Sequence, residues 1–556
     1  MKVNDTLLTD TVEQALALNQ YFVSVYKDDP TDNTFKIQDN QQEVIGYSEI
    51  IEGIEKLNSN SAPGPDGIQN SFLKRTKDSI SFPLMLLFNA SLNSCKIPSE
   101  WKKANVTPIH KSGKKNDVSN YRPISLTSSV CKLLESLLNS TLELFFQEKQ
   151  IIPTSQHGFS RRKSCTTNLL EFFKKVTSFL DKKQNLDAVY LDFRKAFDVV
   201  SHKLLLIEKM KAYDVPSVII NWIANWLSGR RQRVVLEGKV SPWEPVKSGV
   251  IQGSQIGPTL FLLFLSDLST NIDTSVFLSS YADDSKLLGL ANENDNTLQS
   301  SLNELGKWCI RNCMEFNISK CKVVHFGHDN PGKKYYIYGE KLESTDSIKD
   351  LGVIVDQKLK FSEHILKISK RANSLLGQIR RCFSYRKKEA FLSLYKTFVR
   401  SQLEHAVQLW NPWMKKDIDL LEKVQKRALK QITGLSGTYE EKLKQIEIPT
   451  LENRRQRGDL IQTFKIIRNI DDVNYKNWFR FTSEVNIRDS RSVSEARLEI
   501  PFARLDIRKY FFSVRVPKLW NEIPNSTRQN VCTTQFKIGY DEFVENVNQG
   551  MTYYVL

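Results

Sequence analysis

Two adjacent aspartates, Asp283 and Asp284, stand between short apolar runs in the stretch YADDSKLL (residues 281–288). A buried carboxylate that lacks a partner is costly, so the pair is expected either on a solvated turn or beside a cation. Aspartate is a favoured turn residue, and a hairpin turn accounts for the pair by itself. A bound divalent metal ion is the chemical alternative, and it requires further oxygen ligands elsewhere in the chain.

Asp192 is the candidate for such a further ligand. The stretch AVYLDF predicts a buried strand that leads into a helix, and Asp192 stands near the end of that strand. If this strand and SYADD lie in one sheet, the three carboxylates converge at one edge. Oxygen-only ligands suit Mg²⁺, and a pair of such ions supports nucleotidyl transfer to a 3′-hydroxyl. Taken alone, Asp192 is also explained as a strand-end aspartate with satisfied hydrogen bonds.

A second group of residues has the spacing of zinc ligands, namely Cys309, Cys313, Cys321 and His325. The first two cysteines suit one face of a helix, whereas CKVVHF predicts a strand. The thiols are therefore explained by packing in the core beside neighbours such as Trp308, and we expect packing rather than zinc binding.

The composition of the 556 residues is that of a globular protein, with 40% hydrophobic and 26% charged residues. This length suffices for roughly two to four domains. The formal net charge of +16 favours a polyanionic partner such as nucleic acid, although a basic protein without such a partner also fits. The N-terminus lacks the features of a secretory signal, and polar residues, Gly and Pro interrupt the most apolar window, residues 250–268. An intracellular protein without a membrane span is expected.

The patterning predicts strands around the candidate carboxylates and helices in the C-terminal part. Helices are expected from SEIIEGIEKL, QNSFLKRT, FPLMLLFNASLNS and SLTSSVCKLLESLLNSTLELFFQ. Strands are expected from VTPIH and CKVVHF, and hairpins from VVLEGKVSPWEPVKSGV and SYADDSKLLGL, with the aspartates at the bend of the second hairpin. After Gly352, long helices with basic faces follow, including LKISKRANSLLGQIRR and IDLLEKVQKRALKQI.

A series of motifs spans most of the chain. They are, in order, SAPGPDGI, TPIHKSGKKNDVSNYRPISL, QHGFSRRKSCTTNLL, AVYLDFRKAFDVVSHKLLL, SGVIQGSQIGPTLFLLFLSDL, YADDSKLL, FNISKCKVVHFG and DLGVIVDQKLKFSEHI. Their order resembles that of the reverse transcriptases of non-LTR (LINE-type) retrotransposons, especially the jockey-like elements. Any one motif is weak evidence, whereas all of them in order are not expected by chance.

The resemblance implies an α+β fold of the right-hand polymerase type. Such a fold has fingers, a palm whose antiparallel sheet bears the carboxylates, and a helical thumb, followed here by a C-terminal region. The expected segments are an N-terminal extension or linker at 1–45, fingers and palm at 46–340, a mainly helical thumb at 341–470, and a C-terminal region of unknown role at 471–556.

The resemblance also assigns catalytic roles. Asp192 and Asp283 match the metal ligands, and Asp284 matches the neighbour that supports the site. The expected cofactor is Mg²⁺, with Mn²⁺ as an alternative. Lys320 matches a lysine that protonates the leaving pyrophosphate, although Lys322 competes for this assignment and an exposed strand-end lysine is the simpler explanation.

The residues expected to contact the incoming dNTP follow from the same resemblance. Lys111 and Arg122 match the finger positions that bind the triphosphate, where a guanidinium suits phosphate oxygens. Phe197 matches the steric gate that excludes a 2′-hydroxyl, and Gln252 and Gly253 match the lining of the nucleotide pocket. Without the resemblance, a solvated basic loop, a core aromatic and a glycine-rich turn explain these residues, and neighbouring lysines leave the choice of Lys111 open.

Other residues of these motifs receive structural roles. Gly249, Gly253 and Gly257 would permit close approach of the backbone to the base and the template. Asp198 and Asp267 match no ligand position and are interpreted as structural.

The stretch IQGSQI departs from the usual family sequence. Ile251 stands where the family has Pro, and Gln255 and Ile256 stand where it commonly has Val-Leu. The departure bears on fidelity or activity more than on the fold.

The C-terminal helices carry basic residues together with Tyr395, Trp410 and Trp413. These aromatics could stack on bases while the cations follow a phosphate backbone. A helical core with a solvated basic face explains the same residues.

The expected function is that of an RNA-directed DNA polymerase. It would extend a DNA primer with dNTPs on an RNA template, in target-primed copying of an element's own RNA. A decayed or co-opted remnant that binds nucleic acid without polymerising is the alternative. A group II intron maturase or a telomerase-like enzyme is a third hypothesis, but no accessory domain of those enzymes is recognised.

Intact elements of this type usually carry an endonuclease before the polymerase. The residues ahead of SEIIEGI are too few for such a domain, and no C-terminal Cys-Cys-His-Cys knuckle is seen, so target nicking is expected to come from elsewhere. Retrotransposition would require the nucleus, with the cytoplasm as the alternative location. No lysine-arginine cluster is distinctive enough to serve as a localisation signal.

Overall fold

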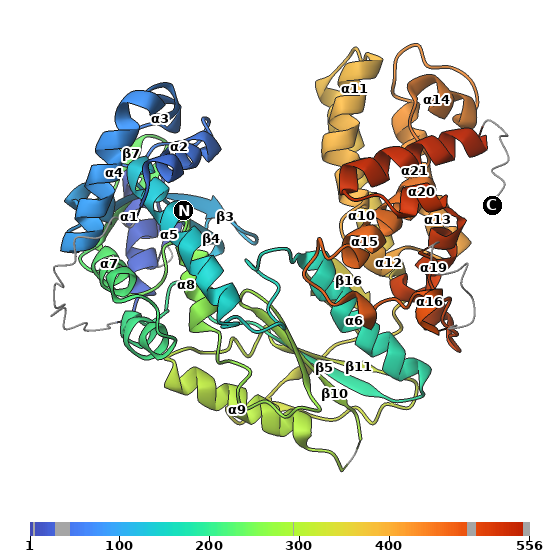
Figure 1. The fold of residues 1–556 in the computed structure, drawn as a ribbon, viewed down its shortest axis with the longest axis horizontal. Helices are drawn as coiled ribbons and strands as arrows, with labels where there is room; N and C mark the ends of the chain where they lie inside the picture. Colours follow the sequence, from blue (N-terminus) through green and yellow to red (C-terminus); the bar gives the residue numbers. More distant parts are fainter. Residues whose placement is uncertain (4–5, 28–44, 293, 486–495, 549–556) are drawn as a thin grey trace. The chain divides into compact units, whose positions relative to one another are not determined.

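The computed structural model describes residues 1–3, 6–27, 45–292, 294–485 and 496–548 (Figure 1). Contacts between residues divide the chain into two compact units. Unit 1 comprises Met1–Phe159, Asp192–Ile272 and Ser301–Asn317, and unit 2 comprises Ser160–Leu191, Asp273–Ser300 and Ile318–Leu556. These units interleave along the sequence and differ from the four consecutive segments expected above, which stay a prediction.

Unit 1 contains a mixed sheet with the strand order β4-β3-β6-β7, and β8 also pairs with β6. The strands of the unit are β1 (Lys2–Val3), β2 (Thr6–Leu7), β3 (Lys103–His110), β4 (Tyr121–Leu126), β6 (Arg231–Leu236), β7 (Lys239–Val240) and β8 (Glu244–Pro245). Its helices are α1 (Thr11–Ser24), α2 (Tyr47–Lys56), α3 (Asn70–Arg75), α4 (Lys77–Ser94), α5 (Ser129–Glu148), a π-type helix (Leu204–Met210), α7 (Ser217–Leu227), α8 (Gly257–Phe264) and most of α9 (Thr297–Arg311). The hairpin predicted from VVLEGKV is confirmed as β6 and β7.

Helix α1 belongs to the core of unit 1. Asp10 caps the helix, because its carboxylate accepts hydrogen bonds from the backbone N–H groups of Val12 and Glu13 at 2.9 and 3.0 Å. Leu18 and Phe22 are buried on one face in a cluster with Val234 of β6. The segment up to residue 27 is therefore an integral part of unit 1, and residues 28–44 of the predicted linker lie outside the described residues.

Unit 2 contains the sheet that carries the candidate aspartates, with the strand order β14-β11-β5-β10-β9. Its strands are β5 (Leu186–Leu191), β9 (Phe277–Tyr281), β10 (Asp284–Leu290), β11 (Lys322–Phe326), β12 (Tyr336–Ile337), β13 (Glu340–Lys341), β14 (Glu343–Ser344), β15 (Ser347–Asp350) and β16 (Val353–Asp356). Its helices are α6 (Cys165–Asp181), α10 (Ser362–Cys382), α11 (Lys388–Leu394), a π-type helix (Tyr395–Val399), α12 (Val407–Trp410), α13 (Lys415–Leu429), α14 (Tyr439–Ile446), α15 (Leu451–Ile467), α16 (Thr482–Val485), α18 (Asp506–Lys509), α19 (Phe512–Glu522), α20 (Asn525–Arg528) and α21 (Thr533–Asn548).

Strand β5 is the centre of this sheet. It pairs antiparallel with β10 on one side and with β11 on the other, and all six of its residues are buried. Helix α6 packs on the sheet, where Phe172 and Phe173 join a hydrophobic cluster with Leu288 and Phe326 (Figure 1). The apolar run of residues 188–191 in β5 is thus explained by burial on both faces.

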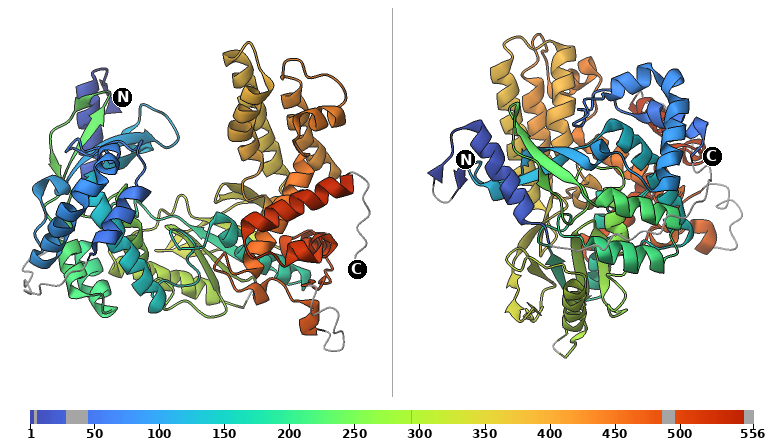
Figure 2. Two further views of the ribbon diagram at one scale, coloured as in Figure 1. Left: turned by 45° about the horizontal axis from the view of Figure 1, so that its top comes forward. Right: turned by 90° about the vertical axis from the view of Figure 1, so that its left-hand side faces the viewer.

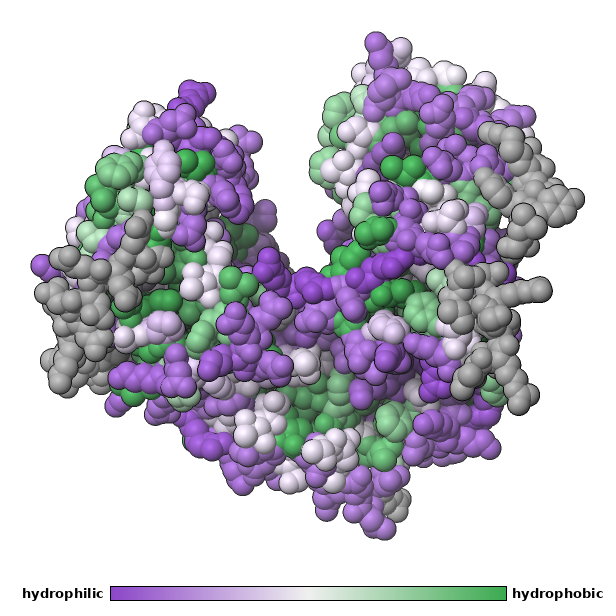
Figure 3. Space-filling view, in the orientation of Figure 1, coloured by the Kyte–Doolittle hydropathy of each residue, from purple (hydrophilic) through white to green (hydrophobic). Residues whose placement is uncertain are grey.

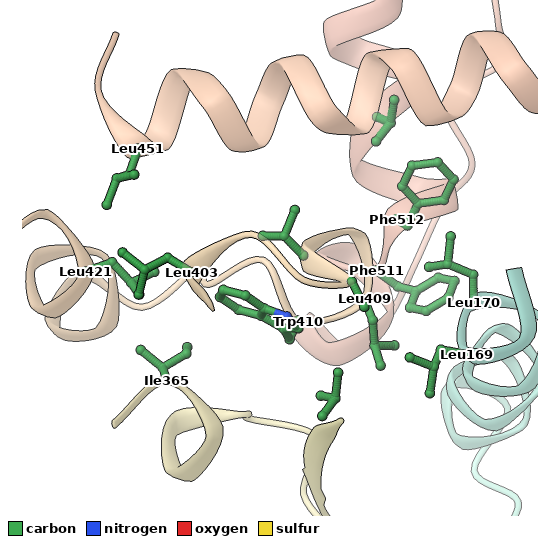
Figure 4. Close-up of a cluster of buried hydrophobic side chains, with 14 of the residues drawn as sticks. Leu169, Leu170, Ile365, Leu403, Leu409, Trp410, Leu421, Leu451, Phe511 and Phe512 are labelled. Carbon is green, nitrogen blue, oxygen red and sulfur yellow. The ribbon is translucent and has the colours of Figure 1, made fainter. Parts of the chain in front are cut away.

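The helices that follow the sheet share one hydrophobic core. Figure 4 shows Trp410 at its centre, with Ile365, Leu403 and Leu421 around it. Leu169 of α6 and Phe511 and Phe512 of the C-terminal segment belong to the same cluster. Contacts of α10 with α13, and of α15 with α19 and α21, join these helices (Figure 2).

The structure corrects one expectation for the aromatics of these helices. The side chains of Trp410 and Tyr395 are 1% and 0% exposed, so their proposed stacking on bases is wrong. Both rings serve the core, which favours the alternative of a helical bundle with a solvated basic face. Trp413 is half-buried and stacks on Tyr510, with ring centroids 5.0 Å apart and an interplanar angle of 1°.

The C-terminal segment is tied to α6 and to α15 by polar contacts. The backbone N–H groups of Arg504 and Leu505 donate to the Asp181 carboxylate at 2.9 and 2.7 Å. Arg515 forms a buried ion pair with Asp459 at 2.9 Å. These contacts assign the C-terminal segment a role in stabilising unit 2.

The visible surface of each unit consists largely of hydrophilic side chains (Figure 3). Across the described residues, no helix combines the length and the apolar character that crossing a membrane requires. Basic side chains on α10 and α13 contribute to this surface, including Arg371 and Lys423.

His364 of α10 is expected to make unit 2 sensitive to acid. The ring is 3% exposed and accepts a hydrogen bond from the Ile354 backbone N–H at 3.2 Å. Burial, followed by the nearby His405 and Lys367, lowers the pKa of His364 from 6.5 to about 4. Because the neutral ring is favoured in the folded state, its contribution is present above pH 6.5 and is lost as the pH falls towards 4.

We expect this loss to reach about 3 kcal/mol of unfolding free energy for the parent chain. Urea unfolding at neutral pH and near pH 4 measures it. The His364→Gln variant keeps a hydrogen-bond acceptor without titrating and should show a smaller difference between the two pH values. The exposed His328→Gln variant is the control, and an equal acid response of the parent and His364→Gln contradicts the prediction.

Candidate active site

The two adjacent aspartates lie at a hairpin turn, as predicted. Asp284 pairs with Tyr281, so β9 and β10 are joined by the two residues Ala282 and Asp283. Ala282 has a φ of 55°, a left-handed conformation that costs a non-glycine residue about 1 kcal/mol. Strain of this kind is typical of functional turns, and here it fixes the direction of the turn that carries Asp283.

The register of β5 against β10 determines at which edge of the sheet the chain reaches Asp192. Leu191 pairs with Ser285, so the chain leaves β5 at the edge of the sheet where β10 begins with Asp284. Asp192 is the next residue along the chain. The end of β5 and the aspartate turn therefore share one sheet edge, which is the arrangement on which the metal-site hypothesis depends.

The three carboxylates provide only oxygen donors, a set that fits Mg²⁺ or Mn²⁺ and does not favour zinc. Within the described ranges, no group of three or more His, Cys, Asp or Glu side chains is arranged to hold a metal ion. The assignment of Asp192 and Asp283 as metal ligands stays a prediction.

Sequence reasoning missed a buried ion pair beside the aspartate turn. Lys286, two residues after Asp284, forms an ion pair with Asp350 of β15 at 2.6 Å, and the two side chains are 5% and 6% exposed. The ammonium also lies 4.6 Å from the centre of the Phe172 ring. Burial lowers the pKa of Lys286 despite the attraction of Asp350. A lysine at an inward-facing strand position was the signal available in the sequence.

The helix expected directly after AVYLDF does not form. The residues after Asp192 form turns, and the next helical segment begins at His202. Phe197 lies in these turns, where its ring stacks on Phe261 with centroids 4.2 Å apart. Phe159 meets the Phe197 ring edge-on at 6.0 Å. Packing therefore fixes the ring of Phe197, whose role as a steric gate stays a prediction.

Gln252 and Asp198 hold two loops of unit 1 together. The Gln252 side-chain amide donates to the Asp198 carboxylate at 2.8 Å, and burial raises the pKa of that carboxyl group. The Gln252 backbone carbonyl accepts a hydrogen bond from the Ser125 N–H at 2.7 Å. Asp198 thus has the structural position expected of it, and it restricts the side chain assigned to the nucleotide pocket.

The glycines of this loop serve the protein's own packing. A Cβ atom at Gly253 would lie 2.5 Å from the Ser125 carbonyl oxygen, and one at Gly249 would lie 2.7 Å from the Asp198 carbonyl oxygen. Both glycines have positive φ, of 111° and 87°. A Cβ at Gly257 would lie 2.6 Å from the Ser254 hydroxyl oxygen. Packing within the protein therefore accounts for these glycines, and their close approach to base and template stays a prediction.

The family comparison decides the identity of this region. Residues 109–355 match the family model of reverse transcriptases (RNA-dependent DNA polymerases). This stretch is therefore similar to a reverse transcriptase domain. The domain contains every predicted catalytic and dNTP-binding residue, together with the Lys286–Asp350 pair.

Relatives of the chain are polymerases of mobile elements. The probable RNA-directed DNA polymerase from transposon BS of Drosophila melanogaster is 29% identical over 70% of this chain and 44% of its own length. The RNA-directed DNA polymerase from mobile element jockey of the same species is 28% identical over the same shares. The chain thus resembles polymerases of non-LTR retrotransposons and spans less than half the length of these relatives. A structure of apo telomerase from Candida tropicalis aligns with a TM-score of 0.34 and 11% identity over 47% of this chain and 54% of that chain, a similarity too low to define the fold.

The predicted triphosphate contacts lie on one hairpin of the reverse transcriptase domain. The backbone N–H of Lys111 donates to the Asn120 carbonyl at 2.8 Å, just beyond the end of β3. Arg122 stands on β4 opposite Ile109, and the side chains of Lys111 and Arg122 are exposed. Both cations are accessible from solvent, and their contact with a nucleotide stays a prediction.

The two candidate lysines for protonating pyrophosphate differ in their surroundings. Lys322 forms an ion pair with Glu343 at 2.5 Å on β11, whereas Lys320 is exposed just before that strand. The assignment of this role to Lys320 stays a prediction.

The zinc-like spacing in the reverse transcriptase domain does not form a zinc site among the described residues. Cys309 and Cys321 are buried in the core, and Cys313 is exposed beyond the end of α9. His325 instead contacts the buried carboxylate of Asp187 through Nδ1 at 2.7 Å. Core packing, the explanation that we expected for the thiols, fits the two buried cysteines.

Proposed function

We propose that the chain is the RNA-directed DNA polymerase of a jockey-like, non-LTR retrotransposon. It would add dNTPs to the 3′-hydroxyl of a DNA primer on an RNA template, in target-primed reverse transcription. The reverse transcriptase domain and the relatives named as RNA-directed DNA polymerases support this proposal. The single observation that carries it is the register that brings the end of β5 to the edge holding the aspartate turn.

The catalytic roles follow from the chemistry of the side chains. Bound Mg²⁺, or Mn²⁺ as an alternative, would activate the 3′-hydroxyl and stabilise charge on the leaving pyrophosphate. Asp192 and Asp283 would hold the ions, and Asp284 would support them. Lys320 would deliver a proton to a pyrophosphate oxygen, a role that its exposed ammonium group permits.

The substrate contacts are part of the same proposal. Lys111 and Arg122 would bind triphosphate oxygens through charge-assisted hydrogen bonds. Phe197 would exclude a 2′-hydroxyl by contact, a task suited to a ring held by its stacking on Phe261. Gln252 and Gly253 would line the nucleotide pocket, with Gln252 oriented by Asp198.

We also propose the right-hand architecture for this chain. The antiparallel pairing of β5 with β10 and β11 suits a palm sheet, the β3–β4 hairpin suits the fingers, and the basic helices α10 and α13 suit a thumb. Endonuclease activity would come from another source, and the reaction would take place in the nucleus.

Primer extension by the purified chain tests the proposal. We expect extension of a DNA primer on an RNA template with dNTPs and Mg²⁺, and none when a chelator removes the metal ion. Filter binding of the primed template, measured in parallel, separates the alternatives. Salt-sensitive binding without extension would identify the decayed or co-opted remnant, while absence of both would contradict the proposal.

A further inference from the structure

A cavity in unit 1 lies beside the loop that follows Asp192. Its volume is about 300 Å³. It is lined by Tyr21, Val25, Lys27, Arg194, Lys195, Val199 and Glu315. Every lining residue belongs to unit 1, and three separate stretches of the chain contribute them. The volume matches the lower range of small-ligand sites.

The wall of this cavity carries more positive than negative charge. The lining contains three cationic side chains, those of Lys27, Arg194 and Lys195, and a single carboxylate, that of Glu315. Arg194 pairs with Glu315 at 3.2 Å, with both side chains more than half exposed. The two lysines therefore provide a net positive charge that suits a phosphate group.

The cations are held in defined places. The Lys27 ammonium donates to the Cys313 carbonyl at 2.5 Å. The Lys195 ammonium lies 4.9 Å from the centre of the Tyr21 ring, over its face. Lys195 has a φ of 50°, and its carbonyl accepts a hydrogen bond from the Asp198 N–H at 2.9 Å, which fixes the turn. A site that is formed before binding loses less entropy when it takes a ligand.

The cavity also offers an aromatic surface beside Lys195, the ring of Tyr21. Tyr21 stands near the end of α1, next to Phe22, which is buried in the core of the unit. A ring with phosphate-binding cations around it has the chemistry of a site for single-stranded nucleic acid, where bases stack on aromatics and cations contact the backbone.

We infer that this cavity binds one nucleotide unit of a single-stranded nucleic acid. Lys27 and Lys195 would contact its phosphate, and Tyr21 would contact its base or sugar. The Arg194–Glu315 pair would form the rim of the site. The inference rests on the proposed function, which supplies the strand. A strand bound here would run past the loop that carries Phe197.

Fluorescence anisotropy with a short labelled oligouridylate and oligothymidylate tests this site in the full chain. The variants are Lys27→Gln, Lys195→Asn and Tyr21→Leu, where asparagine tolerates the positive φ of position 195. Lys239→Gln on β7, an exposed lysine outside the cavity, is the matched control. Thermal unfolding verifies that each variant is folded.

Affinity falls as salt rises, so the slope of log affinity against log salt is negative. Each lysine variant should reduce the magnitude of this slope by about 0.7, the value for one lost phosphate contact on a single strand. Tyr21→Leu should weaken binding roughly five- to a hundredfold without changing the slope. The control should match the parent. Slopes equal to that of the parent for both lysine variants would overturn the inference.

Two further measurements distinguish binding of a strand in this cavity from binding of a free nucleotide or phosphate, and this inference from the proposed function. Competition by a free deoxynucleoside monophosphate or inorganic phosphate as effective as that by the oligonucleotide would overturn the assignment to a strand. Primer extension is measured on the same preparations. If the lysine variants show the expected slope changes but the parent does not extend a primer, only the proposed function is contradicted. If the parent extends a primer but the slopes of the lysine variants equal that of the parent, only the inference about the cavity is contradicted.

Discussion

Replacing Asp283 with alanine is expected to abolish primer extension while the affinity for primed template stays close to that of the parent. The carboxylate stands in the two-residue turn between β9 and β10, where it would hold a metal ion at the reacting phosphate. Loss of such a ligand should lower the rate of extension at least about a thousandfold, or about 4 kcal/mol of transition-state stabilisation. Single-turnover extension with saturating primed template measures the effect.

The matched control for this prediction is Asp329→Ala, which removes an exposed carboxylate from the same reverse transcriptase domain. It should retain the extension rate of the parent. Thermal unfolding should give the same midpoint for both variants, because residue 283 lies in a turn and not in the core. Extension by Asp283→Ala at the parental rate would refute the metal-ligand assignment.

Asp350→Ala is expected to destabilise the chain by about 3–5 kcal/mol, because it leaves the charge of Lys286 buried without its partner. The pKa of Lys286 is lowered chiefly by burial, so the attraction of Asp350 does not repay the loss of hydration. The pair therefore specifies how β10 and β15 are placed more than it adds net stability. Urea unfolding of the full chain measures the loss.

The double variant Lys286→Met/Asp350→Leu should recover most of this loss, since apolar side chains can fill the same space without a desolvation cost. The exposed pair Lys322–Glu343 on the neighbouring strands offers a matched control, and Glu343→Ala should cost below about 1 kcal/mol. Equal losses for Asp350→Ala and Glu343→Ala would show that burial does not set the energy of the pair.

Much of the local structure could be predicted from the sequence. The hairpin of SYADDSKLLGL formed with its aspartates at the bend, and the strand of CKVVHF formed as β11. Turn preferences and side-chain alternation act over a few residues, so a short stretch contains the information. The helix expected directly after AVYLDF was wrong, because turns held by contacts such as the Arg194 N–H to the Glu315 carbonyl, at 2.9 Å, replace it.

The residues whose roles changed are those that meet distant partners. Trp410 and Tyr395 are aromatic residues among basic ones, a combination that can form a base-stacking surface. Both are nevertheless buried in the core of unit 2. Gly253 also makes room for the Ser125 carbonyl, a contact that the sequence did not predict. A local sequence pattern predicts neither burial nor close approach, because both depend on segments that are far apart in the chain.

The sequence by itself determined the order of the motifs, and it predicted the similarity to reverse transcriptases and the three candidate carboxylates, since motifs and turn preferences are local properties. Only the tertiary structure decided the register that pairs Leu191 with Ser285, the burial of Lys286 with Asp350 and the charged cavity beside Lys195. Such pairings join residues that are separated along the chain. Their energies come from the exclusion of water and from the geometry of packing, which exist only once the chain has folded.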